Sequence, residues 1–216
     1  MDRHGLMGAS KLGGSTKRDS RIPHLKPQLL LIGGGAGSGK TVLARALAEA
    51  VPNAALVHLD LCYYSDPDVA PSVPRFDGPG RVVDFSDPLA LDPARIRAAL
   101  AEHADAALVI VEGTFALALP ELTAIATVAA FVDTPADIRV VRKTLRKIRE
   151  GKDPAPGLLG HGTSRVSHTR HVAPTREHAD IVLDGTRPPA ELVAELRAQL
   201  TDPREGGLGH GSGAAG

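Results

Sequence analysis

The sequence has few aromatic residues and a single cysteine, and both shortages narrow the class of protein. Aromatic residues make up 3% of the 216 residues and tryptophan is absent, so a hydrophobic core must be built from Ala, Val and Leu. Cys62 is the only cysteine, which excludes an internal disulfide and fits a reducing compartment. With 43% hydrophobic and 23% charged residues, the composition is otherwise that of an ordinary globular protein.

The sequence also lacks net charge and long hydrophobic runs. Its 25 basic residues balance its 25 acidic residues, which argues against attraction of the whole protein to nucleic acid or to an anionic membrane. No apolar run approaches the roughly 18 residues of a membrane span. The first residues lack the apolar segment of a signal peptide. We therefore expect a cytoplasmic enzyme that binds neither nucleic acid nor membrane.

Composition along the sequence predicts one domain between two polar tails. Residues 1–24 mix Gly, Ser, Lys and Arg without periodicity, and residues 204–216 are rich in glycine, so we expect both tails to be disordered. Residues 25–203 alternate apolar runs with helical patterns and are long enough to bury a full core. No internal repeat divides this domain further.

Within the domain, predicted strands alternate with predicted helices. The strands are expected at Gln28–Ile32, Ala55–Leu59, Ala107–Val111, Val128–Val132 and Asp180–Leu183, as short continuous apolar runs. The helices are expected at Lys40–Ala50, Pro93–His103, Ala136–Glu150 and Pro189–Leu200. Short apolar strands of this type suit a parallel sheet that is covered on both faces. The pattern therefore predicts a doubly wound, three-layer α/β fold.

A glycine-rich loop directly behind the first predicted strand is the most informative stretch. From Gly34 the sequence reads G-x-x-x-x-G-K-T, the phosphate-binding P-loop, in the strand–loop–helix context that the motif requires. The predicted ATP contacts are Gly34, Gly35, Ala36, Gly37, Ser38, Gly39, Lys40 and Thr41. Lys40 is expected to reach the β- and γ-phosphates, and the Thr41 hydroxyl to bind Mg²⁺. The alternative is a glycine-rich turn that matches by chance.

Acidic residues follow two of the predicted strands, at the edge where chemistry gathers in such sheets. Asp60 ends the run Ala-Leu-Val-His-Leu, and Glu112 ends the run Ala-Leu-Val-Ile-Val. Asp60 could accept the proton of a substrate hydroxyl while that oxygen attacks the γ-phosphate. Glu112 could hold Mg²⁺, directly or through water, or bind a substrate hydroxyl. The alternative is that each carboxylate only caps a neighbouring helix or turn.

The predicted helix at 136–150 concentrates positive charge. It carries an apolar stripe of Ile138, Val141, Leu145 and Ile148, and an adjacent basic face of Arg139, Arg142, Lys143, Arg146 and Arg149. In a neutral protein this concentration indicates an anionic partner. Beside a P-loop it predicts a lid in which Arg142 and Arg146 act in catalysis and Lys143 binds ATP. A solvated helix face is the alternative.

Five segments form a set of motifs in a fixed order. They are Gly33–Thr41, Asp60–Tyr63, Val111–Gly113, Phe131–Arg146 and Pro174–Asp180. The set resembles the uridine kinase / phosphoribulokinase family of P-loop kinases, and most closely its uridine-cytidine kinase and nicotinamide riboside kinase branches. The P-loop alone is common among kinases, whereas the five segments together are specific to this superfamily.

The resemblance implies a kinase that uses ATP and Mg²⁺ to phosphorylate a hydroxyl of a nucleoside, with Asp60 as the catalytic base. Uridine or cytidine is the first acceptor that it implies, followed by nicotinamide riboside or another sugar-like or secondary-metabolite acceptor. The acceptor is expected to contact Tyr63, Asp84, Phe85, Glu112 and Phe115. A regulatory module that binds nucleotide without catalysis is the alternative from another class.

Two segments depart from the family pattern. Residues 84–88, Asp-Phe-Ser-Asp-Pro, are the nearest match to the family's N-[FYW]-D-H-P, with Ser86 at the acidic position. Residues 154–169 are rich in Gly, Pro and Ser where the family usually has a further helix. We therefore expect an altered acceptor preference.

Overall fold

The computed structural model describes residues 28–75 and 78–201, and the predicted tails 1–24 and 204–216 lie outside them. The apolar runs form the strands β1 (Gln28–Gly33), β2 (Ala54–His58), β5 (Leu108–Glu112), β6 (Val128–Asp133) and β7 (Ile181–Asp184). They make a five-stranded sheet of order β2-β5-β1-β6-β7, in which every pair is parallel. Each strand lies within one residue of its predicted bounds. The central strand, β1, leads directly into the P-loop.

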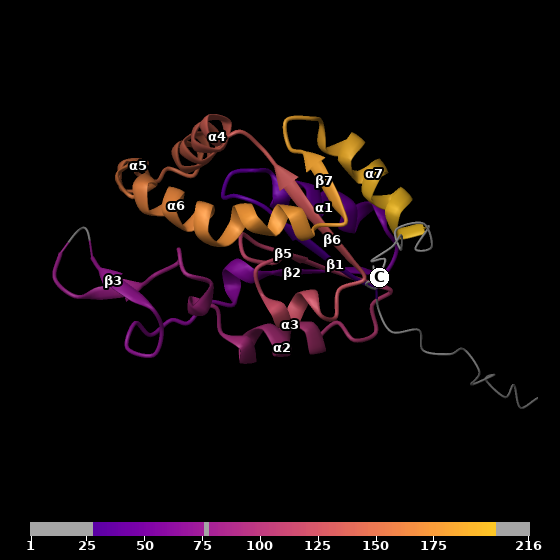
Figure 1. The fold of residues 1–216 in the computed structure, drawn as a ribbon, viewed down its shortest axis with the longest axis horizontal. Helices are drawn as coiled ribbons and strands as arrows, with labels where there is room; N and C mark the ends of the chain where they lie inside the picture. Colours follow the sequence, from indigo (N-terminus) through magenta and orange to yellow (C-terminus); the bar gives the residue numbers. More distant parts are fainter. Residues whose placement is uncertain (1–27, 76–77, 202–216) are drawn as a thin grey trace, which may run out of the picture.

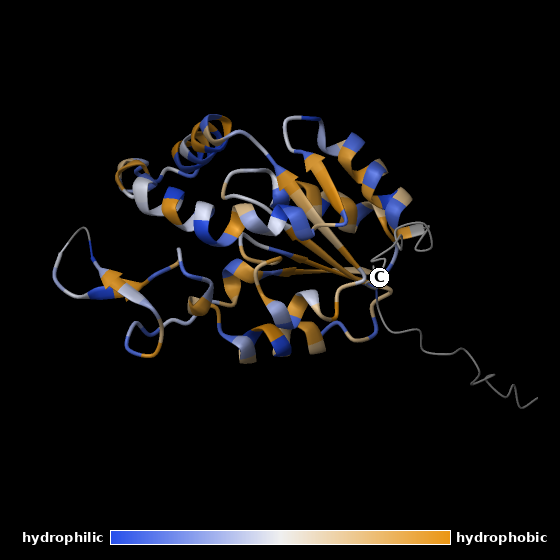
Figure 2. Cartoon of the chain, viewed as in Figure 1, coloured by the Kyte–Doolittle hydropathy of each residue, from blue (hydrophilic) through white to orange (hydrophobic). Residues whose placement is uncertain are grey.

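Helices cover both faces of this sheet (Figure 1). They are α1 (Lys40–Ala50), α2 (Pro93–Ala101), α3 (Pro120–Thr123), α4 (Ala136–Arg149) and α7 (Pro189–Thr201). Because side chains of a strand alternate between faces, Leu30 packs in the core beneath α1 and α7, whereas Leu31 packs in the core on the α2 and α3 side. Figure 2 shows the apolar strands enclosed between amphipathic helices. The doubly wound, three-layer α/β fold is confirmed.

None of the helices in the described part of the sequence has the length and apolarity that a membrane crossing requires. The longest, α4, has 14 residues and carries many cations. The predicted helix starts are also confirmed where capping residues defined them. Asp92 caps α2, since its side chain accepts a hydrogen bond from the Ala94 N–H at 2.8 Å.

A short antiparallel hairpin, which the sequence analysis did not predict, extends beyond the sheet. It consists of β3 (Ser72–Pro74) and β4 (Arg81–Val83). Strands of three residues carry no readable period, so the pattern of apolar residues gave no sign of them. The hairpin positions the Phe85–Ser86 segment that follows it.

The segment 154–169 is largely helical although it is rich in Gly, Pro and Ser. It forms α5 (Ala155–Leu159) and α6 (His161–Ser167), and a π-helical turn (His168–Val172) continues from α6. Tertiary contacts outweigh the low helix propensity of its glycines. The Ser167 hydroxyl donates to the Ser86 carbonyl, and Val172 is buried in the core. Together α4, α5 and α6 form a lid over the carboxyl edge of the sheet.

Helix α4 turns its apolar stripe toward solvent. Val141, Leu145 and Ile148 are 56%, 43% and 54% exposed, and no residue of the helix is fully buried. A core helix of the same pattern would bury this stripe. The half-buried positions of α4 include Arg139 and Lys143 as well as Ile138, the first residue of the stripe. The helix therefore presents basic side chains to the site below it.

Candidate active site

The P-loop occupies the turn between β1 and α1. Its backbone has positive φ at Gly34 (132°), Gly37 (85°) and Gly39 (105°), where residues with a Cβ are strained. Gly34 also lies against β6, because a Cβ there would be 2.5 Å from the Val132 carbonyl oxygen. Helix α1 begins at Lys40, so its free N–H groups face the loop and favour a bound anion. This geometry is that of a phosphate-binding loop.

Lys40 is buried against the loop, with 6% of its surface exposed. Its Nζ donates to the Gly35 carbonyl oxygen at 3.0 Å. Burial lowers the pKa of Lys40 to about 8, although the carboxylates of Glu112 and Asp60 act in the opposite direction. The Ser38 hydroxyl is buried in the same loop and has no hydrogen-bond partner in the described part of the sequence. Phosphate oxygens would supply the missing partner of Ser38 and accept from the remaining N–H donors of Lys40, so these residues fit a bound triphosphate.

Thr41, Glu112 and His58 form a hydrogen-bonded set at the carboxyl edge of the sheet. The parallel register places Glu112 beside Ile32 of β1 and beside His58 of β2. The Thr41 hydroxyl donates to Glu112 Oε1 at 3.0 Å, and His58 Nδ1 lies 2.7 Å from the same oxygen. Hydroxyl and carboxylate oxygens are the ligands that Mg²⁺ prefers. Thr41 and Glu112 therefore lie close enough to serve one metal ion, directly or through water.

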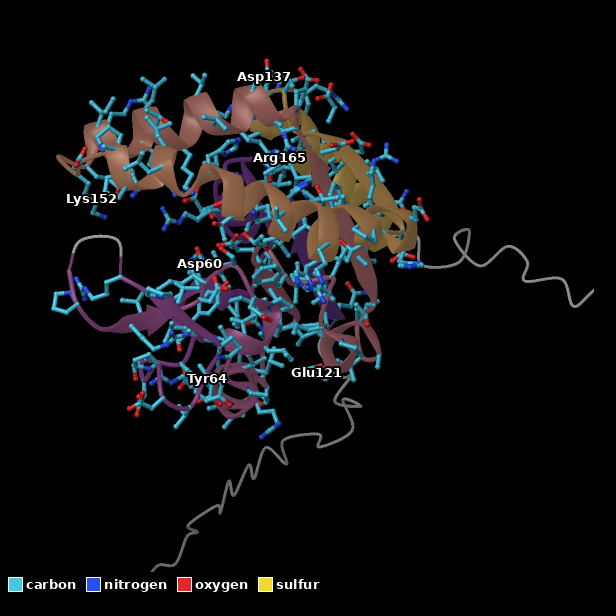
Figure 3. The ribbon with its side chains drawn as sticks, turned by 60° about the vertical axis from the view of Figure 1, so that its left-hand side comes forward. Asp60, Tyr64, Glu121, Asp137, Lys152 and Arg165 are labelled. Atoms are coloured by element: carbon cyan, nitrogen blue, oxygen red, sulfur yellow. The ribbon has the colours of Figure 1, made fainter. Side chains whose placement is uncertain are left out.

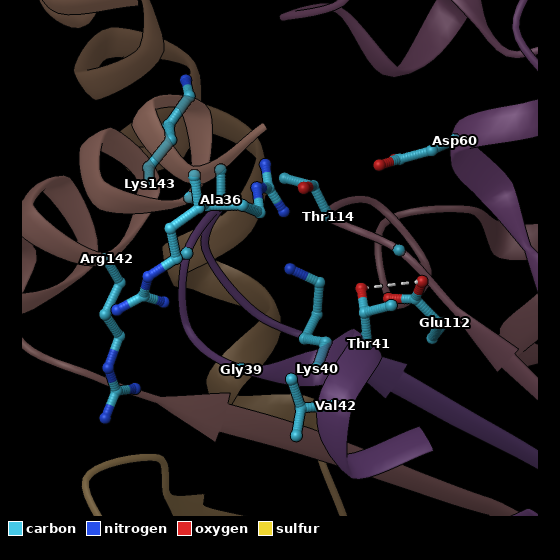
Figure 4. A pocket seen from close by; sticks show the side chains of 14 residues that line it. Ala36, Gly39, Lys40, Thr41, Val42, Asp60, Glu112, Thr114, Arg142 and Lys143 are labelled. Carbon is cyan, nitrogen blue, oxygen red and sulfur yellow. Dashed lines mark hydrogen bonds between the residues drawn. The ribbon is translucent and has the colours of Figure 1, made fainter. Parts of the chain in front are cut away.

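Asp60 lies in the 3₁₀ turn that follows β2 (Leu59–Leu61) and lines the same cavity as the P-loop. This space of about 380 Å³, here called the phosphate cavity, is lined by Ala36, Gly37, Gly39, Lys40, Thr41, Val42, Asp60, Glu112, Gly113, Thr114, Arg142, Lys143, Arg146 and Arg149. Figure 4 shows the Asp60 carboxylate entering the cavity opposite α4, with Lys40 and the Thr41–Glu112 hydrogen bond between them. The cavity thus brings together every residue of the predicted phosphate site except Gly34, Gly35 and Ser38, which lie deeper in the loop.

The lid supplies the positive side of the phosphate cavity. Arg142 Nη1 donates to the Gly185 carbonyl oxygen at 2.8 Å, so this arginine also ties α4 to the segment after β7. Burial, followed by the nearby charges of Lys147 and Arg146, lowers the pKa of Lys143. Among the described residues, no carboxylate counteracts that shift. Lys40, Arg142, Lys143, Arg146 and Arg149 thus give the cavity a lining rich in positive charge.

Arg139 and His58 also belong to the site, although neither was predicted as a site residue. Arg139 Nε donates to the Thr134 carbonyl oxygen at 3.1 Å, and its guanidinium fills the space where a Gly35 side chain would lie. Their positions in the sequence could have indicated this role. Arg139 is the first basic residue of α4, and His58 lies two residues before Asp60. The contact between His58 and Glu112 depends on strand register, which the sequence alone did not define.

A second space of about 200 Å³, here called the lid cavity, adjoins the first and shares Ala36, Thr114 and Lys143 with it. Its other lining residues are Phe85, Ser86, Phe115, Ala136, Arg139, Val140, His161, Ser164, Arg165, Ser167, His168 and Val172. Phe85 and Phe115, both predicted to contact the acceptor, therefore line a space next to the P-loop. Phe115 is 2% exposed and belongs to the core, whereas Phe85 is 60% exposed.

Tyr63 and Asp84, also predicted to contact the acceptor, line neither cavity. The Tyr63 hydroxyl donates to the Phe85 carbonyl oxygen at 3.3 Å, and the two rings meet edge to face with centroids 5.0 Å apart. Asp84 Oδ1 accepts a hydrogen bond from the Ser86 N–H at 2.9 Å. Both side chains position the Phe85–Ser86 segment in this structure.

Fold and site together define the class of the protein. A P-loop follows the central strand of a parallel sheet, carboxylates stand at or just after the ends of β5 and β2, and a basic helical lid covers them. This is the P-loop kinase fold. The strand order defines it, since the P-loop strand is flanked by β5 on one side and β6 on the other.

Comparison with known proteins identifies more particular relatives. The family model described as zeta toxin matches residues 14–67. Uridine kinase of Bacillus licheniformis is 28% identical over 181 residues, which cover 73% of this chain and 86% of that protein. Uridine kinase of Deinococcus deserti is 28% identical over 208 residues, with 82% and 98% covered. The chain is similar to uridine kinases over most of its length, and the resemblance predicted from its motifs is confirmed.

Solved structures include more distant neighbours. Shikimate kinase from Acinetobacter baumannii, in complex with shikimate, is 17% identical with a TM-score of 0.49. The match covers 82% of this chain and 94% of that one. The assignment of the fold rests on strand order and on the P-loop, and not on this likeness.

Proposed function

We propose that the protein is an ATP-dependent kinase that transfers the γ-phosphate to a hydroxyl group of a small molecule. The main support is that one cavity is lined by Lys40, Thr41, Asp60 and the lid arginines. A module that only binds nucleotide has no need of a carboxylate facing a basic lid across the P-loop. The similarity to uridine kinases over most of the chain supports the same activity.

In this proposal each side of the phosphate cavity has a separate task. Thr41 and Glu112 would hold Mg²⁺, which neutralises phosphate charge when it is bound with ATP. Lys40 and Lys143 would bind phosphate oxygens, and Arg142 and Arg146 would stabilise the charge that spreads over the transferring group. Asp60 would accept the proton of the attacking hydroxyl. The predicted nucleotide contacts Gly34, Gly35 and Ser38 would act through the loop itself.

Two acceptor classes are supported by different observations. The relatives named uridine kinase favour uridine or cytidine, with Phe85 and Phe115 against the base or ribose. The position of Tyr63 and Asp84 outside both cavities favours the second class, a smaller sugar-like acceptor that needs fewer aromatic contacts.

A coupled assay of ADP formation tests the proposal. The full-length protein, with ATP and Mg²⁺, is offered uridine, cytidine, nicotinamide riboside and a panel of free and substituted sugars, and the product is identified by mass spectrometry. Formation of a phosphorylated acceptor is the expected result. Tight binding of a non-hydrolysable ATP analogue without phosphorylation of any acceptor would instead identify a nucleotide-binding module.

The lid gives a prediction that separates catalysis from stability. Arg146→Ala should lower kcat about ten- to hundredfold, because a cation that stabilises transferring charge is lost. The Arg146 side chain is 60% exposed, so the melting temperature should stay nearly unchanged. Lys152→Ala is the matched control, since Lys152 carries the same charge but lines neither cavity. A lower melting temperature with unchanged kcat would show that this face of α4 is structural.

A further inference from the structure

The lid cavity carries positive charge that the phosphate cavity does not explain. Arg139, Lys143 and Arg165 line it together with His161 and His168, and no carboxylate of the described residues does. Arg165 belongs to α6 and is absent from the lining of the phosphate cavity. Figure 3 shows it in the lid, on the opposite side of the site from Asp60. Its charge is therefore directed at a different part of the site.

A triphosphate has sufficient cationic partners without Arg165. The phosphate cavity already offers it Lys40, Arg142, Arg146 and Arg149, together with the P-loop backbone. Lys143 stands between the two cavities and lines both. Arg165 thus lies outside the cavity proposed for the triphosphate, and Lys143 can serve an anion in either cavity.

Few acidic groups offset this charge from within the protein. Burial lowers the pKa of Lys143, and so do the charges of Lys147 and Arg146, with no opposing carboxylate among the described residues. The pKa of His168 is lowered by burial and by the charge of Arg139, and only Asp133 opposes this. Like charges crowded into a partly enclosed space destabilise one another unless an anion binds among them.

The shape of the lid cavity suits a compact organic molecule with one charged end. Phe115, Val140 and Val172 provide an apolar side, while the cations lie on α4 and α6. The Ser167 hydroxyl donates to the Ser86 carbonyl and so closes α6 onto the segment after the hairpin. A carbon skeleton can pack on the apolar side with a hydroxyl toward the phosphate cavity and an anionic group toward Arg165.

We propose that the phosphate acceptor itself carries an anionic group, a phosphate ester or a carboxylate, which Arg165 and Lys143 bind in the lid cavity. The inference rests on the proposed kinase function and names the class of its acceptor. In the transfer, the acceptor oxygen forms a bond to the γ-phosphorus and the bond from that phosphorus to the leaving oxygen of ADP breaks. The hydroxyl proton passes to Asp60.

Matched pairs of acceptors test the inference directly. The pairs are ribose against ribose 5-phosphate and glycerol against glycerate, with uridine as a further neutral compound. We expect kcat/KM to be at least about tenfold higher for a charged member than for its neutral counterpart and for uridine. Whichever of ribose 5-phosphate and glycerate has the higher kcat/KM indicates whether the anionic group is a phosphate ester or a carboxylate. A higher kcat/KM for a neutral acceptor than for both charged ones would overturn the inference.

Variants then locate the effect in the lid cavity. Arg165→Gln should lower kcat/KM for the preferred charged acceptor about ten- to hundredfold, because a charge-assisted hydrogen bond is lost. Arg170 belongs to the following turn, and its own side chain lines neither cavity, so Arg170→Gln removes the same charge and should have no such effect. Equal kinetics of Arg165→Gln and the wild type would overturn the inference. Transfer to uridine or ribose alone would leave the kinase function intact, whereas no transfer to any compound would overturn both proposals.

Discussion

Lys40→Ala should abolish phosphoryl transfer while the protein stays folded. Lys40 reaches across the loop to the Gly35 carbonyl oxygen, and in the proposed reaction its ammonium binds the β- and γ-phosphates. Burial lowers the pKa of Lys40 to about 8, because water solvates the ammonium poorly. A poorly solvated ammonium attracts a phosphate group more strongly than an exposed one does. We expect kcat to fall by about a hundredfold or more, the range for loss of one group that stabilises transition-state charge.

Two further variants separate the charge of Lys40 from its packing. Lys40→Met keeps an unbranched buried side chain and removes the ammonium, so it should lose activity as Lys40→Ala does and retain more stability. Arg45→Ala removes an exposed cation from the same helix and should behave as the wild type. Steady-state kinetics and thermal unfolding measure both quantities. If Lys40→Ala kept more than a tenth of the wild-type kcat, a loss smaller than about 1.4 kcal/mol, Lys40 would not have the proposed role.

The sequence predicted the sheet because its signals are local. Each central strand is a run of apolar residues that is buried on both faces, and Asp92 with Pro93 defined the start of α2. The hairpin and α6 lacked such signals. Three-residue strands show no period, and α6 contains glycine and serine whose helical state depends on contacts such as that between Ser167 and Ser86.

The candidate site was predictable where a motif fixes spacing along the chain, as at Gly34–Thr41, and where a residue ends a strand, as at Asp60 and Glu112. It was not predictable where partners come from different elements. His58 meets Glu112 through the register of β2 with β5. The apolar stripe of α4 faces solvent, and this orientation depends on how the helices of the lid pack together. The periodicity of the sequence shows that a stripe exists but not which way it faces.

Asp60→Asn should bind ATP yet lose most turnover. The amide has nearly the same shape as the carboxylate, so the turn after β2 and the phosphate cavity should be preserved. The amide does not accept the proton that the acceptor hydroxyl loses when its oxygen attacks the γ-phosphate. General-base catalysis typically contributes 10²- to 10⁴-fold, so kcat should fall by about a hundredfold or more. Binding of an ATP analogue, measured by calorimetry, should remain within about threefold of the wild type, since Lys40 and the P-loop bind the phosphates.

Two other carboxylates help to test Asp60: Asp68 serves as a control, and Glu112 is the alternative general base. Asp68→Asn makes the same chemical change in an exposed loop outside both cavities and should leave kcat unchanged. Glu112 is the other carboxylate of the phosphate cavity, but its Oε1 already accepts from Thr41 and lies 2.7 Å from His58. It is therefore better placed to hold a metal ion than to take a proton. If Asp60→Asn turned over normally while Glu112→Gln lost kcat without weaker Mg²⁺ dependence, the base would be Glu112, and the assignment of these two carboxylates would have to be exchanged.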